Sequence, residues 1–421
     1  MADRSYFGTD GVRGVAGLHP MTAEFAFRLG VATAETLRRQ GADRPAVAIG
    51  SDTRRSGNML AQAAAAGIMS RGGRAIHLGV LPTPGVSYLT RALGAHAGIV
   101  ISASHNPFED NGIKLFNQDG EKLSDALEHD LEKLIDAGGD GLPPVTGEAI
   151  GTSQRYRRDN NDYQTFLLEH APALGGLHIG LDCANGACYE LAPRIFQRLG
   201  ARLDVINAHP DGLNINVRCG STHPEAMQLR VREVGLDLGV TFDGDADRAL
   251  LVDRRGRLVT GDHILAICAL ARGESAFVAS HVYNRGVQRY LAAHGVGMIR
   301  TQVGDRYVHA ALREHGLTLG GEQSGHVLFL EHSPTGDGLL SALQTLEAVA
   351  RSGRGLEEWM DEIPLFPQVL RNVRVPNGLK ARLGDHPAVQ RALAEAEAEL
   401  GGEGRINLRP SGTEPLVRVM V

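Results

Sequence analysis

The stretch Arg44–Val80, RPAVAIGSDTRRSGNMLAQAAAAGIMSRGGRAIHLGV, carries the pattern that determines the fold. A short apolar run typical of a buried strand ends in a turn of Gly, Asp and Arg residues. The Ala-rich segment that follows favours a helix, and it stops at two glycines, which suit a helix C-terminus. A second apolar run comes next. The stretch therefore predicts a strand, a turn, a helix and another strand.

The same order of elements recurs twice further along the chain. It returns in LHIGLDCANGACYELAPRIFQRLGARLDVIN (177–207) and in SAFVASHVYNRGVQRYLAAHGVGMIRTQV (275–303). Strands that alternate with helices in this way indicate βαβ units, that is, sheets with helices packed on their faces. The sequence thus predicts the α/β class, with three similar mixed-sheet domains.

Breaks in the pattern divide the chain into four parts. We expect α/β domains over residues 1–150, 151–252 and 253–365. The remainder, 366–421, ends in INLRPSGTEPLVRVMV and predicts a smaller C-terminal α+β domain. It stops directly after the strand that follows its polar loop, so we expect this domain to be C-terminally short. Ligands of α/β sheets gather at the carboxyl ends of strands, so a cleft between the domains could collect the polar loops that follow the apolar runs.

Composition narrows the functional classes. The 421 residues are 43% hydrophobic and carry a formal net charge of −6, which argues against a nucleic-acid-binding protein. No apolar stretch approaches the ~20 residues that cross a bilayer, and the N-terminus lacks the features of a secretory signal, so we expect a cytoplasmic protein without a membrane partner. The four cysteines are too scattered for a disulfide framework or a zinc site.

An aspartate loop follows one of the apolar runs. TFDGDADRALLVD places Asp243, Asp245 and Asp247 at alternate positions, so their carboxylates can converge. Three like charges held together repel one another unless a cation neutralises them, and oxygen ligands select a hard ion such as Mg²⁺. An exposed acidic turn is the alternative. A calcium-binding helix–loop–helix is excluded because Arg248 and Arg254 occupy its required Gly and Glu positions.

A serine turn ends the apolar run in GIVISASHNP (98–107). Ser104 alone is weak evidence, since serines are common in turns of this composition. No G-x-S-x-G motif is present, and His105 is the immediate neighbour of Ser104, so a Ser–His–Asp hydrolase fits poorly. A serine beside a Mg²⁺ site suits a phosphoryl carrier, because the cation makes phosphorus easier to attack.

Two further loops suit a phosphorylated sugar. RPSGTEP offers Arg409, Ser411, Gly412 and Thr413 as donors for an anion, although a simple hairpin turn would have the same composition. GGEQSGH offers Glu322, Ser324 and His326 for sugar hydroxyls, and a polar loop without a ligand is the alternative. No phosphate-binding P-loop is present, so the phosphate is expected to arrive on the substrate.

Taken together, these loops resemble the α-D-phosphohexomutase superfamily. The motifs occur in the order found in that superfamily and span nearly the whole chain: FGTDGVRG, ISASHNPFEDNGIKLF, FDGDADR, GGEQSGH and RPSGTEP. Within it, YFGTDGVRG, Gln323 and VGDRYV (303–308) favour the branch that acts on hexosamine phosphates over those that act on mannose or glucose phosphates.

The resemblance implies four domains around a central cleft, three of them of similar α/β build, and roles for individual residues. Ser104 would be the phosphoserine, and its phosphate would join Asp243, Asp245 and Asp247 around one Mg²⁺ ion. Arg13, Lys114 and Arg248 would line the phosphoryl-transfer site, with Lys114 and His326 as candidates for the acid and base. Glu322 and Ser324 would bind sugar hydroxyls. The phosphate that is not reacting would be held by Arg409, Ser411, Gly412 and Thr413.

The resemblance also implies a reaction. Glucosamine 6-phosphate would be converted to glucosamine 1-phosphate through a bisphosphorylated sugar, which would also serve as primer. The product would feed UDP-N-acetylglucosamine and peptidoglycan precursors. Three alternatives stay open: the mannose or glucose phosphate mutases, a Mg²⁺-dependent sugar phosphatase, and a sugar-phosphate sensor without catalysis. A homodimer is compatible with the resemblance.

Overall fold

The first sheet contains the strand–helix–strand unit of Arg44–Val80. In this computed structural model, residues 6–8, 10–156, 162–376, 382–383, 385–401, 404–410 and 416–421 are described. The strand order of the first sheet is β1 (Val12–Val15), β5 (Asp110–Asn117), β4 (Ala97–Ile101), β2 (Ala46–Ser51), β3 (Arg74–Val80), β6 (Thr152–Arg155). The helices are α1 (Ala23–Arg39), α2 (Arg55–Ser70), α3 (Thr83–Ala92) and α4 (Asp125–Asp136), with a 3₁₀ turn at Gly147–Ala149. Apolar clusters cover both faces of the sheet.

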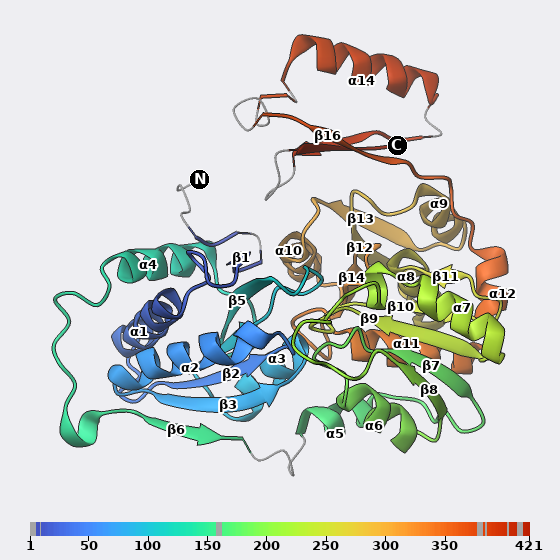
Figure 1. The fold of residues 1–421 in the computed structure, drawn as a ribbon. Helices are drawn as coiled ribbons and strands as arrows, with labels where there is room; N and C mark the ends of the chain where they lie inside the picture. Colours follow the sequence, from blue (N-terminus) through green and yellow to red (C-terminus); the bar gives the residue numbers. More distant parts are fainter. Residues whose placement is uncertain are drawn as a thin grey trace.

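The second and third sheets repeat this build (Figure 1). The strand order of the second sheet is β11 (Leu258–Val259), β10 (Ala249–Asp253), β9 (Leu238–Phe242), β7 (His178–Asp182), β8 (Arg202–Ile206). Its helices are α5 (Asp162–Glu169), α6 (Leu191–Arg198) and α7 (Glu225–Val234), with a 3₁₀ turn at Gly220–Thr222. The third has the order β13 (Gly297–Thr301), β12 (Ala276–Ser280), β14 (Leu319–Gly321), β15 (Val327–Phe329), with α8 (Gly261–Arg272), α9 (Arg285–Ala293), α10 (Asp305–His315), α11 (Gly338–Ser352) and α12 (Leu356–Glu362).

The three predicted βαβ units are confirmed. In each, two strands run parallel and a helix connects them: β2–α2–β3, β7–α6–β8 and β12–α9–β13. Antiparallel strands complete every sheet, as in β4–β5, β9–β10 and β14–β15, so the sheets are mixed as expected. One continuous apolar core runs through the second and third units, from Tyr163 to Ile363.

The C-terminal part is a small α+β unit, as predicted. Its sheet has the order β16 (Leu370–Arg374), β18 (Leu416–Met420), β17 (Asn407–Pro410), and α14 (Pro387–Glu399) accompanies it. Figure 1 shows this unit beside the third domain, which it follows in the chain. No residue of α14 is buried.

Two edge strands bear on the domain boundaries. β6 begins after residue 150 yet pairs with β3, and β11 begins after residue 252 yet pairs with β10. We therefore propose to move the boundaries expected at 150 and 252 to about residues 156 and 260. The boundary near 365 remains a proposal as it stands.

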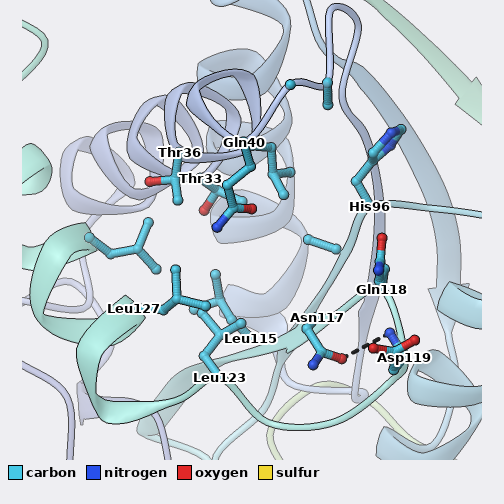
Figure 2. A pocket seen from close by; sticks show the side chains of 15 residues that line it. Thr33, Thr36, Gln40, His96, Leu115, Asn117, Gln118, Asp119, Leu123 and Leu127 are labelled. Atoms are coloured by element: carbon cyan, nitrogen blue, oxygen red, sulfur yellow. Dashed lines mark hydrogen bonds between the residues drawn. The ribbon is translucent and has the colours of Figure 1, made fainter.

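A pocket of about 440 Å³ lies in the first domain. Figure 2 shows Gln40, the residue that follows α1, extending over it, opposite Leu115 and Leu123. The residues that line it include none of the predicted site residues. It is therefore separate from the site described next. Among the described residues, no helix is long and apolar enough to span a membrane.

Candidate active site

Ser104 occupies a sharp turn directly after β4. Its backbone has φ = +53°, a left-handed conformation that costs a non-glycine residue about 1–2 kcal/mol. The turn is fixed locally because the Ser104 amide donates to Ser102 Oγ at 3.0 Å, and Ser102 Oγ donates to Asp52 Oδ2 at 2.5 Å. Ser104 is buried. A strained serine held this firmly is typical of a functional turn rather than of a simple polar loop.

Arg54 and Asn216 clamp the same turn through its carbonyl groups. The buried Arg54 guanidinium donates to the carbonyls of Ser104 at 2.9 Å and Asn106 at 2.8 Å. Asn216, from the second domain, donates to the same two oxygens at 2.8 and 3.0 Å. Arg54 also binds the Pro107 and Asp110 carbonyls and pairs with Asp52 at 2.9 Å. Neither residue was predicted from the sequence.

The aspartate loop follows β9 and faces Ser104. Asp243, Asp245 and Asp247 are buried, and their ligand atoms lie within 4.8 Å of one another. Ser104 Oγ donates to Asp243 Oδ2 at 2.6 Å, which joins the first and second domains. Burial, reinforced by the charges of Asp247 and Asp245, raises the pKa of Asp243 well above its ordinary value. The exposed acidic turn considered as an alternative is therefore wrong.

These carboxylates fit a cation. Asp245 Oδ1 and Asp247 Oδ1 are buried and accept no hydrogen bond from the described part of the chain. Buried, unsatisfied oxygens are costly, so a ligand for them is expected. All ligand atoms are carboxylate oxygens, which could hold a metal ion of the hard, oxygen-preferring kind. Thr83, which begins α3, donates to Asp245 Oδ2 at 2.6 Å and was also missed from the sequence.

The three predicted basic residues surround this group. Lys114 Nζ lies 3.0 Å from Asp245 Oδ2 and 3.4 Å from Asp247 Oδ2. Burial opposes its charge, but the carboxylates Asp10, Asp245 and Asp247 outweigh burial and raise the pKa of Lys114 well above its ordinary value. Lys114 is therefore held as a cation by its acidic neighbours.

The two arginines approach the site from different domains. Arg13 Nη1 donates to the Ala103 carbonyl at 3.2 Å and pairs with Asp10 through Nη2. Arg248 lies beside Asp247, with a separation of 3.7 Å between Nε and Oδ1. Together with Lys114 they bring positive charge to the turn that carries Ser104.

The side chains of Ser104 and His105 lie within hydrogen-bonding distance, although neighbouring residues seldom have this geometry. His105 Nδ1 lies 3.3 Å from Ser104 Oγ. Burial, with the nearby charges of Arg248 and Arg13, lowers the pKa of His105 to about 4. The imidazole is therefore neutral at pH 7 and can accept a hydrogen bond.

The predicted sugar loop lies against the aspartate loop. The Ala249 amide donates to the Gly325 carbonyl at 3.2 Å. Glu322 Oε1 accepts from the Gly304 amide at 2.9 Å, and Ser324 Oγ is buried without a hydrogen-bond partner among the described residues. His326 lies between two carboxylates, 3.6 Å from Asp247 Oδ1 and 3.6 Å from an oxygen of Asp305.

The expected anion loop is described only at its start. Arg409 lies on β17 opposite Arg418. Burial, with the charge of Arg418, lowers the pKa of Arg409 from its ordinary value, and Glu322 opposes this effect. Ser411, Gly412 and Thr413 lie outside the described residues. Of the predicted set, the structure therefore brings together Ser104, the three aspartates, Arg13, Lys114, Arg248 and His326 directly.

Comparison with known proteins identifies the class. The chain matches the phosphoglucomutase/phosphomannomutase family along its length: alpha/beta/alpha domain I at residues 4–140, domain II at 161–256, domain III at 260–366 and the C-terminal domain at 370–421. The chain therefore belongs to this family, and it is an enzyme of the phosphohexomutase class, an isomerase.

Two relatives that are more than half identical to this chain are phosphoglucosamine mutases. A phosphoglucosamine mutase of Deinococcus radiodurans is 55% identical over 421 residues, covering 100% of this chain and 94% of that protein. One of Thermus thermophilus is 52% identical over 418 residues, covering 99% and 94%. A phosphoglucomutase/phosphomannomutase family protein of Burkholderia thailandensis has a similar structure, with a TM-score of 0.81, 26% identity, and coverage of 100% and 93%.

Proposed function

We propose that the chain interconverts glucosamine 6-phosphate and glucosamine 1-phosphate. The observation that carries this proposal is the position of Ser104, whose Oγ meets the buried carboxylate triad at Asp243. A nucleophilic oxygen beside a cation site is the arrangement that phosphoryl transfer requires. The choice of sugar is supported by the names of the relatives that are 52–55% identical.

The Ser104 side chain would carry the phosphoryl group in the resting enzyme. In the first transfer, the bond from phosphorus to Ser104 Oγ breaks and a bond to a sugar hydroxyl oxygen forms, giving a bisphosphorylated sugar. The hydroxyl proton passes to a base, for which His326 is the candidate. Ser104 Oγ takes up a proton as it leaves phosphorus, and Lys114, held as a cation by its acidic neighbours, is the candidate acid. After the bisphosphate reorients, its other phosphoryl group passes to Ser104 Oγ, which gives up its proton to a base, and the sugar oxygen that phosphorus leaves takes up a proton.

The remaining residues would position the reacting groups. Asp243, Asp245 and Asp247, with the Ser104 phosphate, would hold Mg²⁺, which would neutralise charge on the phosphate oxygens. Arg13 and Arg248 would face the transferred group. Glu322 and Ser324, whose buried hydroxyl oxygen lacks a partner among the described residues, would bind sugar hydroxyls. Arg409, Ser411, Gly412 and Thr413 would hold the other phosphate.

Further expectations accompany this function. A bisphosphorylated sugar would prime Ser104, and the enzyme would work in the cytoplasm as a monomer or a homodimer. The alternatives are the same chemistry on glucose or mannose phosphates, and hydrolysis of the phosphoserine by a Mg²⁺-dependent phosphatase.

An isomerisation assay separates these functions. The parent protein is supplied with glucosamine 6-phosphate, Mg²⁺ and a bisphosphate primer, with glucose and mannose 6-phosphates in parallel. We expect glucosamine to be preferred, Ser104→Ala to lose at least about 10³-fold in rate, and EDTA to abolish turnover reversibly. Ser153→Ala, on the exposed strand β6, is the matched control. Phosphate release without isomerisation would support the phosphatase, and an active Ser104→Ala variant would refute the phosphoserine.

A further inference from the structure

Six ionisable side chains form a closed ring in which acidic and basic groups alternate. The first domain contributes three of them, the second domain one and the third domain two. In order around the ring they are Lys114, Asp10, Lys122, Asp305, His326 and Asp247, which returns to Lys114.

The first half of the ring crosses from the first domain to the third. Lys114 Nζ lies 3.1 Å from Asp10 Oδ2, and the other carboxylate oxygen of Asp10 pairs with Lys122. Lys122 Nζ then reaches Asp305 Oδ2 at 2.5 Å. Lys122 therefore lies between one carboxylate of its own domain and one of the third domain.

The second half returns through His326. Its Nε2 lies 3.6 Å from Asp305 Oδ2, and its Nδ1 lies 3.6 Å from Asp247 Oδ1. Asp247 Oδ2 completes the ring at 3.4 Å from Lys114 Nζ. Both candidates for proton transfer, Lys114 and His326, are thus members of the ring, and each contacts two carboxylates of the ring.

The proposed function assigns no role to Lys122 or Asp305. Asp305 is the first residue of α10 and belongs to the VGDRYV motif. Its neighbour in that motif, Gly304, donates its amide to Glu322 Oε1 at 2.9 Å. The motif therefore contacts two side chains of the predicted sugar loop, Glu322 through the backbone and His326 through Asp305.

From this geometry we propose that Lys122 and Asp305 are positioning residues. Their contact is the link of the ring that joins the first and third domains, and it fixes Lys114 and His326 relative to Ser104 when those domains meet. The proposal rests on the phosphoryl-transfer function given above. Positioning of reacting groups is worth a great deal, because misplacement by about 1 Å can cost about 100-fold in rate.

A neighbouring ion pair provides the matched control. Arg313 of α10 pairs with Glu121 at 2.5 Å and thus joins the same two domains next to Lys122. The Arg313 side chain is 63% exposed, against 21% for Lys122. Within the described part of the chain, no hydrogen bond or ion pair links either member of the control pair to a residue of the proposed catalytic site. Exposed pairs of this kind contribute little to stability.

The first experiment compares kcat and KM for glucosamine 6-phosphate. We expect Lys122→Met and Asp305→Asn each to lower kcat about 10- to 100-fold, with KM changed less than about threefold. The control variants Glu121→Gln and Arg313→Met should stay within about twofold of the parent. Circular dichroism and thermal melting check the fold, and Lys122→Arg, which can keep both contacts, should retain kcat within about fivefold even if Lys122→Met does not fold.

Charge-reversal variants distinguish a ring of six interacting groups from a single ion pair between Lys122 and Asp305. In Glu121→Arg/Arg313→Glu the pair is restored, so kcat should match the parent. In Lys122→Asp/Asp305→Lys the introduced carboxylate would face Asp10 and the introduced ammonium would face His326, so kcat should stay low. Parent-like kcat in Lys122→Met and Asp305→Asn, or recovery in the ring reversal, would overturn the proposal. A parent protein that does not isomerise any hexose phosphate would instead refute the proposed function.

Discussion

The clamp on the Ser104 turn allows a quantitative test by a double-mutant cycle. The carbonyls of Ser104 and Asn106 each accept two hydrogen bonds, one from Arg54 and one from Asn216. The perturbations are Arg54→Lys, Asn216→Gly and their combination. Glycine is chosen at 216 because the backbone there has φ = +60°, which glycine adopts without strain.

The magnitudes follow from the hydrogen bonds that are lost. Asn216→Gly removes two bonds at about 1 kcal/mol each, while Arg54 still satisfies both carbonyls, so local opening should become about 2 kcal/mol easier. Lys at position 54 has three donors, whereas Arg54 serves five acceptors, so at least two charged bonds are lost, at about 3 kcal/mol in total. In the double variant, a carbonyl that the introduced lysine does not reach keeps no donor, which should add about 1–2 kcal/mol beyond the sum.

Hydrogen exchange of the peptide that covers residues 101–112 measures this directly. The amides of Ser104 and Asn106 are hydrogen-bonded within the turn, so their exchange reports local opening. We expect Asn216→Gly to speed exchange about 30-fold, since 1.4 kcal/mol corresponds to a factor of ten. The buried strand β12 serves as the internal reference. Additivity in the double variant within about 0.5 kcal/mol would refute the idea of shared acceptors.

Two further predictions concern the third domain. Burial raises the pKa of Asp262 from 3.8 to about 7. Between pH 3.8 and about pH 7, the native protein therefore keeps a proton that the unfolded chain releases, so the free energy of unfolding falls as pH rises through this range. Asp262→Asn should therefore be up to about 4 kcal/mol more stable than the parent at pH 8 and equal to it at pH 4, measured by urea unfolding; a parent curve flat in pH would contradict this. At Gly325, where φ is +88°, an added Cβ would lie 2.2 Å from the Ala249 carbonyl oxygen. Gly325→Ala should therefore lower both the melting temperature and kcat. Parent-like values of both would refute the steric argument. Gly273→Ala, at φ = +68° with open space around it, should cost only about 1–2 kcal/mol and serves as its control.

The local sequence pattern was sufficient to predict the helices and strands, and also the loops that hold the candidate site residues. The Arg44–Val80 unit and its two repeats are strand–helix–strand, as predicted, because the apolar runs that form strands and the glycines that end helices are local features of the sequence. Asp243, Asp245 and Asp247 converge as expected, but they do so in a turn with Ala246 at φ = +53° and not in the extended backbone on which the expectation rested. Sheet order did not follow, since β6 and β11 join sheets through pairing across the predicted boundaries.

The supporting residues depend on contacts between segments far apart in the chain. Arg54 lies in SDTRRSG, which has the composition of an ordinary polar turn, yet it binds carbonyls about 50 residues away. Asn216 acts across more than 100 residues, and Lys122 finds Asp305 in another domain. No periodicity in one sequence encodes such partners. The positive φ of Ser104 was equally hidden, because serine rarely adopts it without support from the surrounding structure.

The hold that Asn216 has on the Ser104 turn has a consequence for recombination between related genes. A crossover between residues 54 and 216 would combine an arginine from one parent with an asparagine from the other, and both must fit the same pair of carbonyl oxygens. The contact of Thr83 with Asp245 imposes a second match across the overlapping interval 83–245. A crossover within the first two domains therefore preserves the clamp only when both parents carry compatible residues at these positions, whereas a crossover near residues 366–370 leaves these contacts whole.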